Sequence, residues 1–117
     1  MKNDAAPFLP LSPAALHILL ALAGEDRHGY GIMQETARQS GGRFKLGPGT
    51  LYDNLQRLLE QRIVQEASSA RDSDPRRRYY RLTGLGHDIL RAEIARLETI
   101  IRDAKLSLES PRPRSVS

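Results

Sequence analysis

The stretch that decides the fold is residues 47–82, GPGTLYDNLQRLLEQRIVQEASSARDSDPRRRYYRL. Gly47 and Pro48 open a helix that we expect to run to about Arg62, since proline suits the first helical position. Its apolar side chains recur at helical spacing on one face: Leu51, Leu55, Leu58 and Leu59. The opposite face carries side chains that can hydrogen-bond: Thr50, Asp53, Asn54 and Arg57, with Tyr52 on the flank. This helix is therefore amphipathic, with a polar outer side.

A β-hairpin is expected directly after this helix. Residues 63–67 read as a short strand, 68–75 as a polar turn and 76–82 as a returning strand rich in arginine and tyrosine. Seven charged residues fall between Arg71 and Arg81, and five of them are arginines. Because successive strand residues point to opposite faces, we expect Tyr80 to join the core with Leu82, and the environment of Tyr79 stays open.

Upstream, two further helices are expected. Ser12 and Pro13 are typical of a helix start, and this first helix runs to about Ala23, with Gly24 as its stop. It is apolar nearly all round, which indicates contacts with a second subunit through Leu16, Leu19 and Leu20. After a polar turn over 25–29, a second helix is expected over 30–40, with Tyr30, Met33 and Ala37 at helical spacing and a stop at Gly41 and Gly42. Two short helices before an amphipathic third are typical of a helix-turn-helix.

A long helix capped by Thr83 is expected at the C-terminal side. Its apolar residues step by four and three alternately, which predicts a dimer seam: Leu90, Ile94, Leu97, Ile101, Ala104 and Leu108. We therefore divide the chain into an N-terminal arm, 1–11, that is loose or lies across a partner; a winged helix-turn-helix, 12–82; a dimerisation helix, 83–108; and a disordered tail, 109–117. The fold class is mainly α with a small β-hairpin wing.

Composition narrows the function classes. The 117 residues contain no cysteine, which excludes disulfides and thiolate metal sites, and the apolar run from Ile18 to Ala23 is too short for a membrane span. We expect a cytoplasmic protein with no cofactor and no metal. His17, His28 and His87 show no spacing typical of a metal or catalytic site, so each is expected to be structural or solvated, and the chain is not expected to be an enzyme. The net charge of +4 favours an anionic partner.

The polar face of the third helix and the hairpin arginines are the candidate DNA-binding surface. Thr50 and Tyr52 suit phosphate oxygens, while Asn54 and Arg57 are types that read base edges. Asp53 is expected to accept from a cytosine amino group or to pair with a neighbouring arginine. The alternatives are a polar face that only meets water and an arginine-rich edge that only prevents strand pairing. The full candidate set is Lys45, Gly49, Thr50, Tyr52, Asp53, Asn54, Arg57, Arg71, Arg76, Arg77 and Arg78.

The sequence resembles the PadR-type transcriptional regulators, in particular short members with one C-terminal helix. The resemblance spans about residues 12–108 and rests on three segments: residues 28–32, residues 48–58 and residues 78–86, which read HGYGI, PGTLYDNLQRL and RYYRLTGLG. It implies a homodimer in which the third helix enters the major groove and the hairpin forms the wing. We expect such a dimer to match the symmetry of a pseudo-palindromic operator. The resemblance also implies a repressor that is released by a small molecule bound near the dimer interface.

Two residues depart from the family pattern. Arg62 stands where glycine is common after the third helix, which argues against a left-handed stop there, and Asp53 stands where proline or a small residue is frequent. The tryptophan-lined drug site of some members has no counterpart, because the chain has no tryptophan. Two rival functions remain at this point: a winged-helix adaptor that binds proteins, and a ligand-binding module whose DNA affinity is vestigial.

Overall fold

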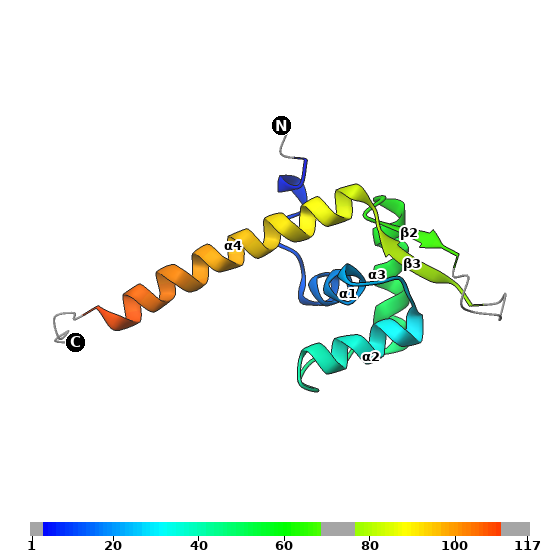
Figure 1. The fold of residues 1–117 in the computed structure, drawn as a ribbon, viewed down its shortest axis with the longest axis horizontal. Helices are drawn as coiled ribbons and strands as arrows, with labels where there is room; N and C mark the ends of the chain where they lie inside the picture. Colours follow the sequence, from blue (N-terminus) through cyan, green and yellow to red (C-terminus); the bar gives the residue numbers. More distant parts are fainter. Residues whose placement is uncertain (1–3, 69–76, 111–117) are drawn as a thin grey trace.

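The computed structural model describes residues 4–68 and 77–110. In these described residues the structure has four α-helices, with a small sheet at one side of them (Figure 1): α1 (Pro13–Ala23), α2 (Gly29–Gln39), α3 (Pro48–Glu60) and α4 (Gly84–Glu109). The strands are β1 (Arg27–His28), β2 (Val64–Ala67) and β3 (Tyr79–Leu82), and a short 3-10 helix, η1 (Ala6–Phe8), precedes α1. This arrangement confirms the predicted class, a winged helix-turn-helix followed by a long C-terminal helix.

The core lies where α1, α2 and α3 meet the start of α4. The apolar side chains with no exposed surface come from all four helices: Ile18, Leu19, Ile32, Leu51 and Ile89. Ser12 caps α1 as predicted, since its Oγ accepts a hydrogen bond of 3.1 Å from the Ala15 N–H. No helix in the described ranges is long and apolar enough to span a membrane.

The sheet has one strand more than the sequence indicated. The strand order is β1-β3-β2, all antiparallel, with Arg27 opposite Tyr80 and Val64 opposite Leu82. The prediction of a plain polar turn over 25–29 was therefore wrong, because two of these residues pair with the wing strand. A two-residue strand carries too few side chains to show an alternating pattern. The expected turn over 68–75 lies outside the described residues beyond Ser68.

The buried face of α2 also differs from the expectation. Ile32 and Thr36 are fully buried, whereas Tyr30 is 62% exposed. The helix begins at Gly29 and is capped by His28, so its inward face is turned by one residue relative to the predicted Tyr30, Met33 and Ala37 set. Gly41 and Gly42 end it with φ of +64° and +81°, as predicted.

The end of α3 contradicts the expectation for Arg62. Its φ is +62°, so an arginine adopts the left-handed conformation that favours glycine. The Ile63 N–H then bonds to the Leu58 carbonyl at 2.9 Å, which closes the helix and turns the chain into β2. The structure shows that the left-handed stop is kept without the glycine.

A junction centred on Thr83 joins α3, the wing and α4. The Thr83 hydroxyl contacts the carbonyls of Arg62 and Ile63 at 2.7 and 3.0 Å and accepts from the Gly86 N–H at 3.0 Å. The Thr83 N–H donates to the Ile63 carbonyl at 3.1 Å. A Cβ on Gly86 would lie 2.2 Å from that same carbonyl oxygen. Helix α4 therefore passes this backbone so closely that only glycine fits.

Helix α4 packs on the domain only through its first part. Its buried residues are Gly86, Ile89, Leu90 and Glu93, while residues 98–110 are all exposed. In Figure 1 this second half extends well away from the other elements, and the longest dimension of the molecule is 65 Å. The predicted disorder of the tail concerns residues that, from 111 on, lie outside the described part of the chain.

The N-terminal arm packs on its own chain rather than lying loose. Ala5 is buried, and the Leu11 N–H donates to Oε2 of Glu93 at 3.2 Å. Glu93, itself buried, accepts two further bonds from the Arg96 guanidinium at 2.7 and 2.9 Å. These Arg96 bonds hold the pKa of Glu93 below its ordinary value, although burial opposes them. The described residues 4–11 thus contact the base of α4.

We predict that Arg62→Gly stabilises the protein. A left-handed φ costs a non-glycine residue energy that glycine avoids. Glycine also gives the unfolded chain more conformational freedom, which offsets part of this gain, so the net stabilisation is about 0.5–1 kcal/mol. Urea unfolding should show a higher midpoint with an unchanged slope. Gln61→Gly is the control, since Gln61 has φ −83° and should lose stability. An Arg62→Gly midpoint at or below that of the wild type would contradict the left-handed conformation assigned to residue 62.

We also predict that Gly86→Ala destabilises the protein by about 1–3 kcal/mol, because the methyl group meets a backbone carbonyl that cannot rotate away. A Cβ on Gly84, at the start of the same helix, would have no neighbouring atom within 4 Å. Gly84→Ala should therefore leave the thermal midpoint nearly unchanged. Equal effects of the two substitutions would argue against the close approach of α4 to Ile63.

Candidate nucleic-acid interface

A groove of about 400 Å³ lies where α3, the start of α2 and the wing meet. It is lined by aromatic and cationic side chains together with one glycine: His28, Gly29, Tyr30, Tyr52, Arg77, Arg78 and Tyr80. Tyr30 and Tyr52 are 62% and 50% exposed, so their rings line an open surface. Two predicted elements of the DNA-binding surface, the flank of α3 and the wing arginines, therefore meet in one place.

Tyr52 can lie in this groove because Gly29 has no side chain. A Cβ on Gly29 would lie 2.2 Å from the Tyr52 hydroxyl and 2.9 Å from its ring carbon Cζ. The ring of Tyr52 thus rests directly on the first residue of α2. This contact brings a hydroxyl from α3 beside the wing, which the spacing of the sequence alone did not indicate.

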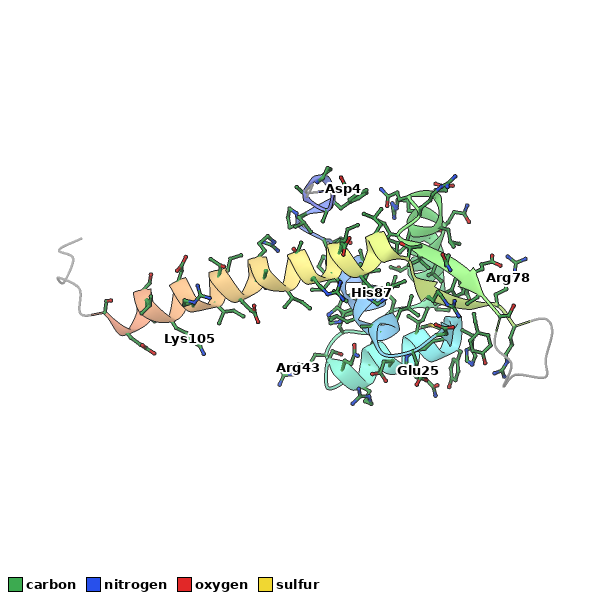
Figure 2. The ribbon with its side chains drawn as sticks, turned by 45° about the horizontal axis from the view of Figure 1, so that its top comes forward. Asp4, Glu25, Arg43, Arg78, His87 and Lys105 are labelled. Atoms are coloured by element: carbon green, nitrogen blue, oxygen red, sulfur yellow. The ribbon has the colours of Figure 1, made fainter. Side chains whose placement is uncertain are left out.

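The described wing arginines already have neighbours. Nη1 of Arg78 lies 3.3 Å from Oε2 of Glu66 on β2, and both side chains remain more than half exposed. Figure 2 shows Arg78 projecting from the wing, away from the helices. Nη1 of Arg77 lies 3.0 Å from Nε2 of His28. Arg71 and Arg76, also expected in the DNA-binding set, lie outside the described residues.

Arg81 and Tyr80 of the wing strand contact other parts of their own chain. The Arg81 guanidinium donates to Oδ2 of Asp26 at 2.8 and 3.2 Å, which links β3 to the loop after α1. Tyr80 is 5% exposed and Leu82 is 6% exposed, so the prediction that both belong to the core is confirmed. Burial raises the pKa of Tyr80, so its hydroxyl stays protonated.

The outer side of α3 is open along its length. Lys45, Gly49, Thr50, Asp53 and Arg57 are all exposed. Asp53 forms no salt bridge within the described ranges, so the expected pairing with an arginine is not seen there. These residues leave a polar helix face uncovered by the chain itself.

Asn54 and Arg57 lie apart from the wing groove. Both line a second groove of about 400 Å³ that separates α3 from the N-terminal arm, with Pro7 and Phe8 on its other side. Asn54 is half-buried, and its amide donates to the Thr50 carbonyl of its own helix at 2.8 Å. One groove therefore joins Tyr52 to the wing, whereas Asn54 and Arg57 line a different groove.

The predicted dimer residues fall into three groups by exposure. Leu19 has no exposed surface and Leu90 only 5%, so both belong to the core of the single chain; they have no side-chain surface to offer a partner, and the expectation for them was wrong. Leu16, Leu20 and Leu97 are partly exposed. The rest are exposed on α4: Ile94, Ile101, Ala104 and Leu108.

The three histidines have the structural or solvated roles expected of them. His17 stacks on Phe44 with ring centres 4.3 Å apart, and His87 is exposed on α4. His28 caps α2, since its Nδ1 accepts from the Gly31 N–H at 3.0 Å. Its place in the wing groove was missed, because no local pattern shows that residue 28 pairs with residue 79.

The fold and this surface define a winged helix-turn-helix regulator with a long C-terminal helix. Residues 18–92 match the transcriptional regulator PadR-like family. The chain therefore belongs to the PadR-like family of transcriptional regulators, which agrees with the prediction that it is not an enzyme.

Relatives of known sequence or structure agree with this assignment. The transcriptional regulator Rv3488 of Mycobacterium tuberculosis is 36% identical over 89 residues, which are 75% of this chain and 78% of that protein. An uncharacterised protein X of Lysinibacillus sphaericus is 33% identical over 69 residues, 59% of this chain and 63% of that protein. A PadR family transcription regulator from Clostridium difficile has a similar structure, with TM-score 0.69 and 26% identity over 83% of this chain and 99% of that one.

Proposed function

We propose that the chain is a cytoplasmic, homodimeric repressor that binds double-stranded DNA at a pseudo-palindromic operator. Each subunit sets α3 into a major groove and its wing against the adjoining backbone. The observation that carries the proposal is the groove in which Tyr52 of α3 lies together with Arg77 and Arg78 of the wing. Aromatic hydroxyls and guanidinium groups on one rim are the groups that hold a phosphate backbone.

The wing supplies the sequence-independent part of the affinity. Arginine side chains that neutralise phosphates release counterions, so the affinity falls as salt rises. The Arg78 pair with Glu66 is exposed at 71% and 51% of the two side chains, and an exposed pair contributes little to stability. Arg78 can therefore exchange this carboxylate for a phosphate at small cost.

The outer face of α3 supplies sequence readout. Thr50 and Asp53 are exposed near the start of the helix, and Arg57 follows one turn later. An arginine discriminates guanine through two hydrogen bonds, and an aspartate accepts from the amino group of cytosine. Asn54 keeps its carbonyl oxygen for a base, because only its amide nitrogen bonds to Thr50.

The bare half of α4 supports the homodimer. Ile94 and Ile101 are 39% and 52% exposed, and Leu108 is 85% exposed, at the spacing of a heptad seam. A second copy of the chain offers the same seam, so pairing of the two α4 helices would bury the exposed apolar side chains of both chains. Dimerisation sets the distance between two α3 helices, which a pseudo-palindromic site requires. Two parts of this proposal are supported by the family resemblance alone. They are repression by exclusion of polymerase and release by a small molecule bound near this interface.

We predict that the double variant Arg77→Ala, Arg78→Ala binds all DNA sequences more weakly. The slope of log K against log salt should become shallower by roughly 0.9 for each phosphate that loses its arginine. Fluorescence anisotropy with a duplex selected from random DNA measures both quantities. Arg57→Ala should instead reduce discrimination at one position of each half-site and leave the salt dependence nearly unchanged.

Arg91→Ala is a charge control, since Arg91 is exposed on α4 and pairs with Asp88. An unchanged salt slope in the wing variant would remove the wing from the interface. If the protein binds no DNA sequence selectively at low salt, the proposed function as a DNA-binding regulator is overturned and a protein-binding adaptor is favoured.

We predict that Ile101→Asp gives a folded monomer. A charge buried in the seam costs enough to weaken dimerisation by at least about tenfold, while Ile101 has no role in the core of one chain. Sedimentation equilibrium measures the association and circular dichroism the fold. Thr99→Asp adds the same charge on the opposite side of α4 and should remain dimeric. Wild-type protein that stays monomeric at tens of micromolar would contradict the seam.

A further inference from the structure

A carboxylate of the wing faces one of the wing's own arginines. Oε2 of Glu66, on β2, lies 3.3 Å from Nη1 of Arg78, which directly precedes β3. Both side chains are more than half exposed, so the pair meets solvent rather than the core. The wing therefore carries an anion beside a cation that belongs to the candidate DNA-binding surface.

Glu66 lies on the face of the sheet that borders the wing groove. In the antiparallel register it stands opposite Tyr80, and opposite residues of two strands share a face. Tyr80 and Arg78 both line the groove that holds Tyr52. Burial is the main reason that the pKa of Tyr80 is raised, and Tyr52 and Glu66 raise it further. The negative charge of Glu66 thus reaches the groove itself.

Two anions cannot share Arg78 without a cost. A carboxylate and a phosphodiester repel each other, so Arg78 binds a phosphate at the expense of its pair with Glu66. This exposed pair is weak, but its carboxylate belongs to the same chain and is always within reach. A phosphate replaces the carboxylate completely only where the DNA backbone is held close to Arg78.

Helix α3 decides where the backbone is held. When its outer face bonds to matching base edges, the register of the duplex against the wing is fixed. On other sequences a DNA-binding protein slides and hops, and no one phosphate stays beside a given side chain. The carboxylate of Glu66 therefore competes best against DNA that lacks the matching bases.

We propose that Glu66 is a specificity-determining residue of the wing: it competes with the DNA backbone for Arg78, so that the contact of Arg78 with a phosphate forms fully only when α3 has found its matching bases. The proposal rests on the proposed DNA-binding function. A phosphate contact carries no sequence information by itself, and Glu66 makes this one depend on the sequence that α3 reads. Non-specific binding is weakened more than operator binding.

The chain offers a matched pair of substitutions. Glu66→Gln removes the negative charge and keeps the size of the side chain. Asp88→Asn is the control, because Asp88 also forms an exposed pair with an arginine, Oδ1 lying 3.5 Å from Nη1 of Arg91 on α4. Exposed pairs contribute little to stability, so the thermal midpoints of both variants should stay close to that of the wild type.

The test measures Kd by fluorescence anisotropy for two duplexes, one selected from random DNA by the wild-type protein and one with that sequence scrambled. Glu66→Gln should bind the scrambled duplex at least about twofold more tightly, because an exposed ion pair accounts for a factor of about 1.4 to 5 and a dimer has two wings. Its affinity for the selected duplex should change less, so the ratio of the two Kd values falls. Asp88→Asn should leave this ratio unchanged.

The same comparison in the Arg78→Ala background shows whether Glu66 acts through Arg78. Without the guanidinium, Glu66→Gln should no longer alter the ratio of the two Kd values. A persisting effect would mean that Glu66 repels phosphates directly, and it would overturn the competition for Arg78.

The outcomes separate this proposal from the function it rests on. If the wild-type protein selects no sequence at low salt, the DNA-binding function fails and the role of Glu66 with it. If the wild-type protein binds selectively but Glu66→Gln keeps both affinities, or strengthens both equally, the role of Glu66 alone is overturned.

Discussion

The hydroxyl of Thr83 is the contact on which the arrangement of this molecule depends. It lies between the last turn of α3, the first residue of the wing and the first turn of α4, and it bonds to the Arg62 and Ile63 carbonyls and the Gly86 N–H. The bare backbone at Gly86 lets α4 pass against Ile63. The Thr83 hydroxyl and the close approach of Gly86 to the Ile63 carbonyl therefore fix the start of α4 against the end of α3. In a dimer built on α4, this same junction places the two copies of α3.

Most of the fold was predictable because its main elements carry strong local signals. The caps at Ser12 and Thr83, the leucine face of α3 and the long α4 helix each follow from patterns within one helix. Strand β1 was not predictable, because two residues contain no period and their pairing with β3 depends on the tertiary fold. Arg62 shows the opposite case. Its residue type disfavours the left-handed backbone conformation that ends α3, but the surrounding structure imposes it.

The candidate site was predictable in its composition but only partly in its grouping. Wing arginines and the polar face of α3 were identified from charge and amphipathicity. Which of these residues share a groove depends on long-range contacts. Tyr52 lies beside the wing because Gly29 has no side chain, whereas Asn54 and Arg57 line another groove together with the N-terminal arm. His28 was read as structural, and that role is confirmed, but its second nitrogen faces the wing only because β1 pairs with β3.

The exposed second half of α4 has a consequence for how the regulator responds to its own abundance. Residues 98–110 are exposed in the described part of the chain, so their apolar side chains would gain burial in the proposed pairing of two chains. With α4 paired as proposed, operator occupancy at low expression rises with the square of the chain concentration rather than in proportion to it. A twofold change in synthesis then alters operator occupancy about fourfold in that regime, a sharpened dose response that needs no ligand.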